Sequence, residues 1–481
     1  MEVGNQTLIK PHVAVLPSVG LGHLIPLFEF AKRLVVHHGI RVSLLVITTN
    51  EPSAAKDQFL CSPNFPPDLH IVKLPPVDVD QVPRDDKLIL TRLCVITEES
   101  LRFLKSVLVA LGKPKALVTD LFSTRAFDVC NELSIPAYLF STTSVAFSAF
   151  MLYLPKLDSE VECEFVELPE PIQVPGCTPV RIEDLVDQAR NRKIDEYKWF
   201  FHHISRLPLA SGIFLNSWED LEPGSINSIE ENPFFKQIPA PPVYPIGPLI
   251  KQEETLSTAD FECLEWLDKQ PPDSVIFMSF GSGGTLSVEQ QTELAWGLEL
   301  SQQRFIWVVR KPTDAAGAGT FFNSGSEVND PKAYLPEGFL NRTQGVGLVV
   351  PSWAPQVSIL GHPSTGGFLS HCGWNSSLES IAHGVPMIAW PLYAEQRMNA
   401  ALLVEEIGVA VRLKVEVGQT IFGREEIERV VRMVMEGEEG KVIRSRVKEL
   451  KESAANALGS NGSSYYMLSS VAQKWKTDLS L

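Results

Sequence analysis

The chain has 481 residues, 44% of them hydrophobic and 21% charged, a composition typical of soluble globular proteins with two or three domains. Its 42 basic and 58 acidic residues give a net charge of −16, which argues against nucleic acid or an anionic membrane as a partner. No apolar run approaches the roughly 20 residues of a membrane span, and the polar stretch 1–10 does not resemble a signal peptide.

The seven cysteines are scattered along the chain and form no CxxC pair. This pattern predicts free thiols in a reducing compartment and argues against a zinc cage. We therefore expect a cytoplasmic protein, and we take a monomer as the default state.

The first half opens with an apolar run at 12–16, which predicts a strand. The glycines of the following loop, Gly20 and Gly22, lead into a helical pattern with one apolar face, and 42–47 predicts the next strand. The order strand, glycine loop, helix, strand requires a parallel sheet with helical crossovers.

The same order returns in the second half of the chain. An apolar run at 275–280 predicts a strand, a glycine loop follows at 281–284, and Ser287 is placed to cap the next helix. The run at 305–309 predicts the next strand. The sequence thus predicts an α/β protein with two Rossmann-like, doubly wound domains facing each other across a cleft, with ligands beyond the carboxyl ends of the strands.

Four prolines lie within 241–248, and we expect no regular element there but a stiff linker. The predicted division is an acceptor-binding domain at 1–240, a linker at 241–260 and a nucleotide-binding domain at 261–460. The last segment, 461–481, is predicted to be a helix that packs back on the N-terminal domain.

A candidate anion site lies at 366–384. A strand at 366–370 is followed by a turn and by a helix expected to begin at Asn375, with Ser376 and Glu379 at capping-box spacing and Gly384 at its end. The free N–H groups and positive dipole end of such a helix attract an anion. An ordinary capped helix in an α/β protein explains the same pattern equally well.

Residues on either side of this helix suit a nucleotide sugar. Upstream, the Trp353 indole could stack on a flat base, and Gln356 could bond a ribose hydroxyl. Downstream, Glu395 and Gln396 follow a predicted strand, where a carboxylate and an amide suit the hydroxyls of a sugar. Base, phosphate and sugar functions thus follow one another along a single segment.

The segment 353–396 resembles the sugar-donor box of plant family 1 UDP-glycosyltransferases, with WAPQ at its start, HCGWNS in its middle and EQ at its end. The resemblance covers essentially the whole chain, from PHVAVLPSVGLGHLIP onward. Stretches such as SFGSGGT and WPLYAEQ are most similar to the hydroquinone glucosyltransferase (arbutin synthase) group. The fold implied is GT-B, and the donor implied is UDP-glucose, because a closing glutamine such as Gln396 is the commoner choice for glucose in the family.

The resemblance implies a role for each donor-site residue. Trp353 stacks on uracil, Ala354 bonds it through its backbone, Gln356 and Glu379 hold the ribose, Ser282, His371, Asn375 and Ser376 hold the diphosphate, and Trp374, Glu395 and Gln396 grip the glucose, with Thr142 as a further contact. The resemblance also implies that no metal is required, and the sequence offers no DxD or acidic pair at a plausible strand end.

His23 is the candidate general base. A neutral imidazole with a pKa near the reference value of about 6.5 is a good base at cytosolic pH, and the family base stands in the same G-H-x-x-P context as Gly22 to Pro26. The plain alternative is a helix N-terminal histidine without a task. Asp120 ends a buried run, so its carboxylate needs a partner: either a backbone amide of the next helix or the ring of His23, which it would orient.

The implied reaction is an inverting transfer of glucose from UDP-glucose to small phenols such as hydroquinone-like phenols, monolignols or flavonoids, giving β-glucosides. The acceptor itself is poorly specified: Phe122, Phe140, Phe147 and Tyr393 are near predicted cleft strands, and each could equally belong to the core.

Two other functions compete with a transferase. A nicotinamide-dependent oxidoreductase needs a third glycine after Gly20 and Gly22 and an acidic residue about 20 positions on, and both are absent. A non-catalytic nucleotide-sugar-binding protein would have no use for both His23 and Asp120.

Overall fold

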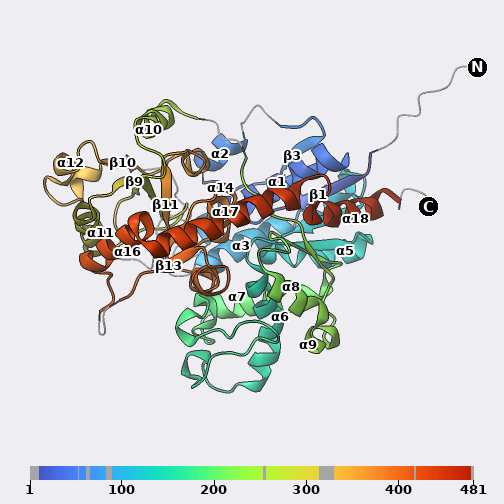
Figure 1. Ribbon diagram of the computed structural model, residues 1–481. Helices are drawn as coiled ribbons and strands as arrows, with labels where there is room; N and C mark the ends of the chain where they lie inside the picture. Colours follow the sequence, from blue (N-terminus) through green and yellow to red (C-terminus); the bar gives the residue numbers. More distant parts are fainter. Residues whose placement is uncertain are drawn as a thin grey trace, which may run out of the picture.

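The strands of this protein are short apolar runs buried on both faces, as expected for parallel strands covered by helices. In β1 (His12–Leu16) every residue is buried, and Ala14 and Leu16 face one core cluster while Val13 and Val15 face another. The structure is a computed structural model that describes residues 10–51, 54–60, 65–82, 89–252, 256–313, 330–415 and 419–477. Within these ranges the elements form two α/β domains, each on its own parallel sheet (Figure 1).

The first sheet has seven strands in the order β3-β2-β1-β4-β5-β6-β7. Besides β1 they are β2 (Arg41–Val46), β3 (Leu69–Lys73), β4 (Ala116–Thr119), β5 (Ala137–Ser141), β6 (Ile213–Leu215) and β7 (Val243–Pro245). Its helices are α1 (Leu21–His38), α2 (Ala54–Leu60), α3 (Ile89–Leu101), α4 (Leu104–Ala110), α5 (Ala126–Leu133), α6 (Val145–Glu160), α7 (Asp195–Ile204), α8 (Pro223–Glu231) and α9 (Pro233–Gln237).

The second sheet has six strands in the order β10-β9-β8-β11-β12-β13. They are β8 (Val275–Ser279), β9 (Arg304–Val309), β10 (Gly347–Pro351), β11 (Thr365–Ser370), β12 (Met387–Ala389) and β13 (Ala410–Arg412). The helices are α10 (Thr258–Asp268), α11 (Val288–Ser301), α12 (Phe339–Arg342), α13 (Gln356–Leu360), α14 (Trp374–His383), α15 (Gln396–Ala401), α16 (Arg424–Glu436), α17 (Glu438–Leu458) and α18 (Ser463–Thr477). The predicted pair of doubly wound domains is confirmed.

Both sheets reverse their winding direction between two central strands, and this is where such folds bind ligands. In the first sheet the reversal lies between β1 and β4, which pair in parallel and end at Leu16 and Thr119. In the second it lies between β8 and β11, which end at Ser279 and Ser370. The segments that follow these four strand ends are therefore brought close together.

The expectation that 241–248 contains no regular element is wrong, because β7 pairs with β6 at the edge of the first sheet. An edge strand tolerates proline, since one side of its backbone needs no ladder hydrogen bonds. Likewise α10 begins at Thr258, inside the expected linker 241–260. The exact domain boundaries remain a proposal.

The C-terminal helix lies against the first domain, although it follows the second in sequence. Leu468, Val471, Ala472 and Trp475 of α18 are buried in the same core cluster as β1 and α1. Figure 1 shows α17 and α18 running one after the other from the second domain to the first. The chain thus crosses between the domains twice.

Candidate active site

His23 lies in the first turn of α1, directly beyond the end of β1. Its ring is 15% exposed, and Nδ1 lies 3.2 Å from Oδ2 of Asp120. Phe122 packs edge-on against the imidazole, with ring centroids 5.2 Å apart. The ring is therefore fixed on one side by a carboxylate and on another by an aromatic face.

Asp120 follows β4 and is completely buried. Both partners considered for it are present: Oδ1 accepts a hydrogen bond from the backbone N–H of Phe122, and Oδ2 lies beside His23. Oδ2 also accepts hydrogen bonds from the N–H and the hydroxyl of Ser18, each at 2.7 Å. Burial acts to raise the pKa of Asp120, but the charge and hydrogen bond of His23 and the two bonds from Ser18 outweigh it, and the pKa lies below its ordinary value. Asp120 is thus held as a carboxylate.

The helix of the predicted anion site is α14, which begins at Trp374, one residue before the expected start. As expected, it is terminated by Gly384, a C-cap in the left-handed conformation. The capping box is wrong: Gly373 occupies the N-cap and makes no side-chain cap. Instead, Ser376 and Glu379 accept hydrogen bonds from the amide Nε2 of Gln356, at 2.9 and 2.6 Å. The first N–H groups of α14 therefore keep no side-chain cap of their own.

The glycine loop after β8 packs against His371 of the turn before α14. A side chain on Gly281 would place its Cβ 2.3 Å from Nε2 of His371, so only glycine fits this close approach. Burial, with a smaller effect of Arg310, lowers the pKa of His371 to about 3. The ring is therefore neutral at physiological pH.

The two ends of the donor segment 353–396 line one cavity. Trp353 is 42% exposed, unusually open for an indole, whereas Ala354 beside it is buried. Glu395 and Gln396 lie at the start of α15. The Nδ2 of Asn399 lies 3.3 Å from Oε1 of Glu395, and burial raises the pKa of Glu395.

Two side chains predicted to bind the sugar already make hydrogen bonds within the protein. Trp374 is 2% exposed, and its indole N–H donates to the carbonyl of Asn216 at 2.9 Å, so the ring nitrogen is not free to bind a sugar. Oε1 of Gln396 accepts from the N–H groups of Leu392 and Tyr393 and shapes that loop. The Trp374 bond joins segments distant in sequence, and the two Gln396 bonds come from backbone N–H groups, which every residue type carries. The sequence therefore gives no signal for any of the three.

One cavity of about 730 Å³ is lined by residues of both domains. Of the predicted site residues, these line it: His23, Thr142, Ser282, Trp353, Ala354, Gln356, His371, Trp374, Asn375, Ser376, Glu379, Glu395 and Gln396. Asp120 lies behind His23 instead. Phe122, Phe147 and Tyr393 also line the cavity, whereas Phe140 is buried in the core against Phe30.

Arg310 is a cavity residue that sequence reasoning missed. It follows β9, its Nη1 donates to the carbonyl of Gly284 at 3.0 Å, and its Nε donates to that of Ser352 at 3.2 Å. Burial lowers the pKa of its guanidinium to about 10, which still leaves it charged at neutral pH. Arg310 directly follows β9, the neighbour of β8. This position could have predicted it as a site residue, because site residues gather at these strand ends.

Polar contacts hold the two domains together around the cavity. Asn375 of α14 donates from Nδ2 to the carbonyl of Gly22 at 2.8 Å. Asp187 of the first domain pairs with Arg397 and accepts from the N–H of Ala394 at 3.0 Å. The loop that carries Glu395 is thus fixed by the opposite domain.

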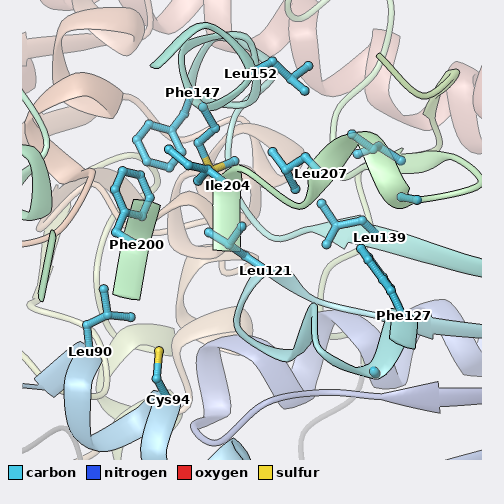
Figure 2. Packing of buried hydrophobic residues seen from close by; sticks show 14 of the residues in the cluster. Leu90, Cys94, Leu121, Phe127, Leu139, Phe147, Leu152, Phe200, Ile204 and Leu207 are labelled. Carbon is cyan, nitrogen blue, oxygen red and sulfur yellow. The ribbon is translucent and has the colours of Figure 1, made fainter. Parts of the chain in front are cut away.

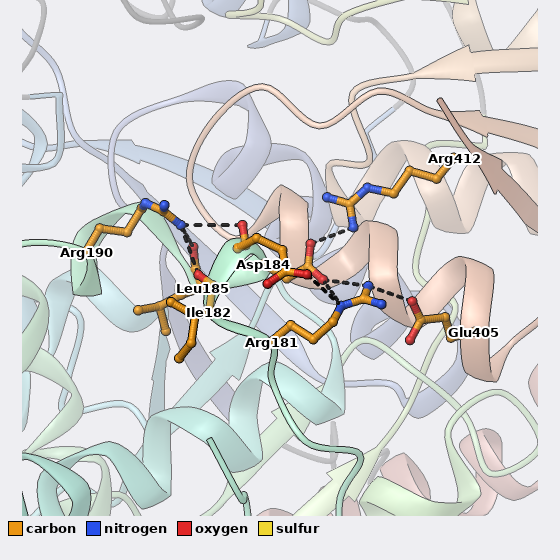
Figure 3. A network of polar contacts seen from close by, with 8 residues as sticks. Arg181, Ile182, Asp184, Leu185, Arg190, Glu405 and Arg412 are labelled. Atoms are coloured by element: carbon orange, nitrogen blue, oxygen red, sulfur yellow. Dashed lines mark hydrogen bonds and ion pairs between the residues drawn. The ribbon is translucent and has the colours of Figure 1, made fainter. Parts of the chain in front are cut away.

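A second group of interdomain contacts lies farther along the same face (Figure 3). Asp184, which is 1% exposed, pairs with Arg181 at 2.7 Å and with Arg412 of the second domain at 2.5 Å. Arg181 also pairs with Glu405 of the second domain at 2.6 Å. We call Arg181, Asp184, Glu405 and Arg412 the interdomain ion cluster.

Two features are absent from the part of the chain that the structure describes. No helix there is both long and apolar enough to cross a membrane. No group of three or more His, Cys, Asp or Glu side chains there is arranged to hold a metal ion.

Comparison with known proteins gives concordant results. The family model of UDP-glucoronosyl and UDP-glucosyl transferases matches residues 243–449. The hydroquinone glucosyltransferase of Rauvolfia serpentina is 49% identical over 474 residues, 98% of this chain and 99% of that protein. The crystal structure of TcCGT1 in complex with UDP has a TM-score of 0.91 at 46% identity, covering 98% of this chain and 100% of that one. For Phytolacca americana UGT2, complexed with UDP-2fluoro-glucose and pterostilbene, the TM-score is 0.86 at 43% identity, with coverage of 97% and 99%.

Two facing doubly wound domains with a nucleotide-sugar segment at their cleft define a GT-B glycosyltransferase. At 49% identity over nearly its whole length, the chain belongs to the plant family 1 UDP-glycosyltransferases. It is an enzyme that uses a UDP-sugar donor, and both the nicotinamide-dependent and the non-catalytic alternatives are set aside.

Proposed function

We propose that this enzyme transfers glucose from UDP-glucose to small phenolic acceptors, with inversion, to give β-glucosides. The observation that carries the proposal is the placement of His23 in the first turn of α1, 3.2 Å from the buried carboxylate of Asp120; Asn375 of the donor helix contacts the same turn at Gly22. The names of two relatives, a hydroquinone glucosyltransferase and an enzyme complexed with pterostilbene, support a phenolic acceptor.

In the proposed reaction His23 takes the proton of the acceptor hydroxyl, and the oxygen attacks the anomeric carbon of the sugar. UDP leaves from the opposite face with the bonding electron pair, so the α-linked donor gives a β-glucoside. Asp120 stabilises the imidazolium and fixes the ring, as the aspartate does in a Ser-His-Asp triad. Since phenols ionise near pH 10, a modest base is sufficient.

The leaving diphosphate needs positive charge from the second domain. In the proposal it is held by Ser282, His371, Asn375 and Ser376, where the N-terminal end of α14 supplies N–H groups and dipole. To these we add Arg310, because a charged guanidinium lines the same cavity close enough to His371 to lower its pKa. A cation and a helix start together would let transfer proceed without a metal, which activity in the presence of EDTA would test.

The remaining donor contacts follow from position. We assign uracil to the exposed Trp353 and the backbone of Ala354, and the ribose to Glu379 with Gln356. We assign the glucose to Glu395, Gln396 and the backbone of Trp374, with Thr142 as a further contact across the cleft. Cytoplasmic location and a monomeric state stay predictions from the sequence.

The acceptor belongs in the apolar part of the cavity, in the first domain. Leu90, Leu121, Phe147 and Phe200 line it and lie near one another in Figure 2. Apolar walls around one base favour aromatic acceptors with few charges. Hydroquinone-like phenols, monolignols and flavonoids all satisfy this requirement.

The test is the substitution His23→Ala. We expect transfer to a phenol panel, read as product mass, to fall by about a hundredfold or more, while calorimetry gives unchanged UDP affinity. His37→Ala, at the far end of the same helix, is the matched control and should retain activity. If His23→Ala turned over phenols as fast as the unmodified enzyme, the assignment of His23 as the base would be wrong.

A further inference from the structure

The apolar part of the cavity contains one buried carboxylate that the proposed reaction does not use. Glu196, in the first turn of α7, lines the cavity and is 8% exposed. Around it the cavity wall is formed by Ile89, Leu90 and Leu93 of α3 and by Phe200 of α7. A charged group in such apolar surroundings is costly unless its oxygens have hydrogen-bond donors.

Two turns of α7 and two ring contacts separate Glu196 from the base. Glu196, Phe200 and His203 occupy one buried face of α7, at positions four and three residues apart. His203 packs against Phe122, which in turn packs against His23. Since an α-helix rises 1.5 Å per residue, Glu196 lies about 10 Å along α7 from the position that backs Phe122.

Two stacked aromatic rings form part of the cavity wall near Glu196. Phe200 stacks on Phe147 with centroids 6.2 Å apart, and both residues line the cavity. Figure 2 shows these two rings facing each other with Leu90 below Phe200. His23, Phe147, Phe200 and Glu196 thus all line the one cavity that would receive the acceptor.

Glu196 has a structural task as well, which only partly occupies it. Its Oε1 accepts the N–H of Thr91 in the first turn of α3, at 2.9 Å. A carboxylate has about four acceptor sites, so the donors from Thr91 and Leu90 leave room for a ligand hydroxyl. Burial raises the pKa of Glu196 in spite of the hydrogen bonds from Thr91 and Leu90, which shows that its charge is incompletely compensated.

We propose that Glu196 accepts a hydrogen bond from a second hydroxyl at the far end of the acceptor, so that the preferred substrates are two-ring phenols with one hydroxyl on each ring. This inference rests on the proposed glucosyl transfer and on His23 as its base. A hydroxyl donating to a carboxylate forms a strong, charge-assisted bond. An ether or a hydrogen at the same position would leave the carboxylate buried and unsatisfied.

The experiment compares a matched acceptor pair, a stilbene with one hydroxyl on each ring and its monomethyl ether, with UDP-glucose as donor. For the unmodified enzyme we expect kcat/KM for transfer to the shared ring to be about tenfold or more higher with the dihydroxy compound. Glu196→Leu should abolish this preference by lowering only the dihydroxy rate. Glu196→Gln keeps an oxygen for Thr91 but presents an N–H donor, so its preference should shift toward the ether.

Asp195→Asn is the control, because Asp195 is the neighbouring carboxylate on α7 and is 60% exposed. It should leave the ratio unchanged. An unchanged ratio in both Glu196 variants, or an equal loss on both acceptors with a lowered unfolding temperature, would overturn the inference and leave Glu196 as a cap of α3. Failure of the unmodified enzyme to glucosylate any phenol of a wide panel would instead overturn the proposed function.

Discussion

The side-chain amide of Asn375, in the first turn of α14, donates to the backbone carbonyl of Gly22 at 2.8 Å. This hydrogen bond joins the helix assigned to the diphosphate directly to the residue before His23. This contact between the domains therefore sets the distance from the base, His23, to the site assigned to the leaving diphosphate. The side-chain Oδ1 of Asn375 is buried and has no protein hydrogen-bond partner in the described chain, so the amide orientation is set by Gly22.

The first prediction concerns this contact. Asn375→Ala removes the hydrogen bond that fixes the distance between the donor site and the base. We therefore expect kcat to fall by about tenfold or more, whereas UDP affinity should fall by much less. Steady-state kinetics and calorimetry with UDP measure the two effects. Asn341→Ala, on the surface of the same domain, should change neither; an equal loss of kcat and UDP affinity would mean that Asn375 acts only as a phosphate ligand.

The second prediction concerns the exposed indole. Trp353→Ala should weaken UDP binding by about tenfold to a hundredfold through loss of base stacking, and Trp353→Phe should recover most of it. Because the indole is 42% exposed, the unfolding temperature should stay close to that of the parent. Phe261→Ala, at another exposed aromatic, serves as the control. Unaltered UDP affinity in Trp353→Ala would contradict the assigned uracil site.

The third prediction concerns the interdomain ion cluster in Figure 3. Asp184→Asn removes the buried carboxylate shared by Arg181 and Arg412, so Arg412 loses this ion pair while Arg181 keeps its pair with Glu405. We expect a loss of about 1–3 kcal/mol in the free energy of unfolding, measured with urea. Arg429→Gln, which breaks an exposed pair with Glu426, should cost at most about 1 kcal/mol. Equal effects of the two changes would show that burial adds nothing to the cluster.

The fourth prediction is a pH dependence at Glu222, which accepts hydrogen bonds from Ser217 and Ala146. Burial raises the pKa of its carboxyl from 4.5 to about 7, outweighing those hydrogen bonds. Below pH 4.5 the group is protonated in both states; as the pH rises toward 7 only the unfolded chain releases the proton, so the folded state loses stability.

Glu222→Gln cannot ionise and keeps an oxygen for the N–H of Ala146. The variant should therefore gain stability relative to the parent as the pH rises from about 5 to about 8, by up to about 3 kcal/mol. Urea unfolding across this range measures the difference. A difference that stays constant with pH would show that Glu222 titrates normally.

Local patterns were sufficient for much of the fold. The apolar run at 12–16 predicts β1, and the Ser287 cap and the glycine at 384 correctly mark the start of α11 and the end of α14. These features depend on neighbours within a turn or a strand. The proline-rich edge strand β7 escaped prediction because its pairing with β6 depends on its place in the sheet.

What the sequence alone determined is the class of enzyme and the parts of its site: two doubly wound halves, a donor segment at 353–396 and a histidine beyond β1. Tertiary structure decided which of these parts touch: Asp120 reaches His23, Gln356 replaces the expected cap by bonding Ser376 and Glu379, and the Trp374 indole is withdrawn to Asn216. The physical reason is that side-chain partners are set by the order of strands in the two sheets and by how the domains meet. Those distances are absent from any local pattern, and so are the buried charges of Arg310 and Glu196.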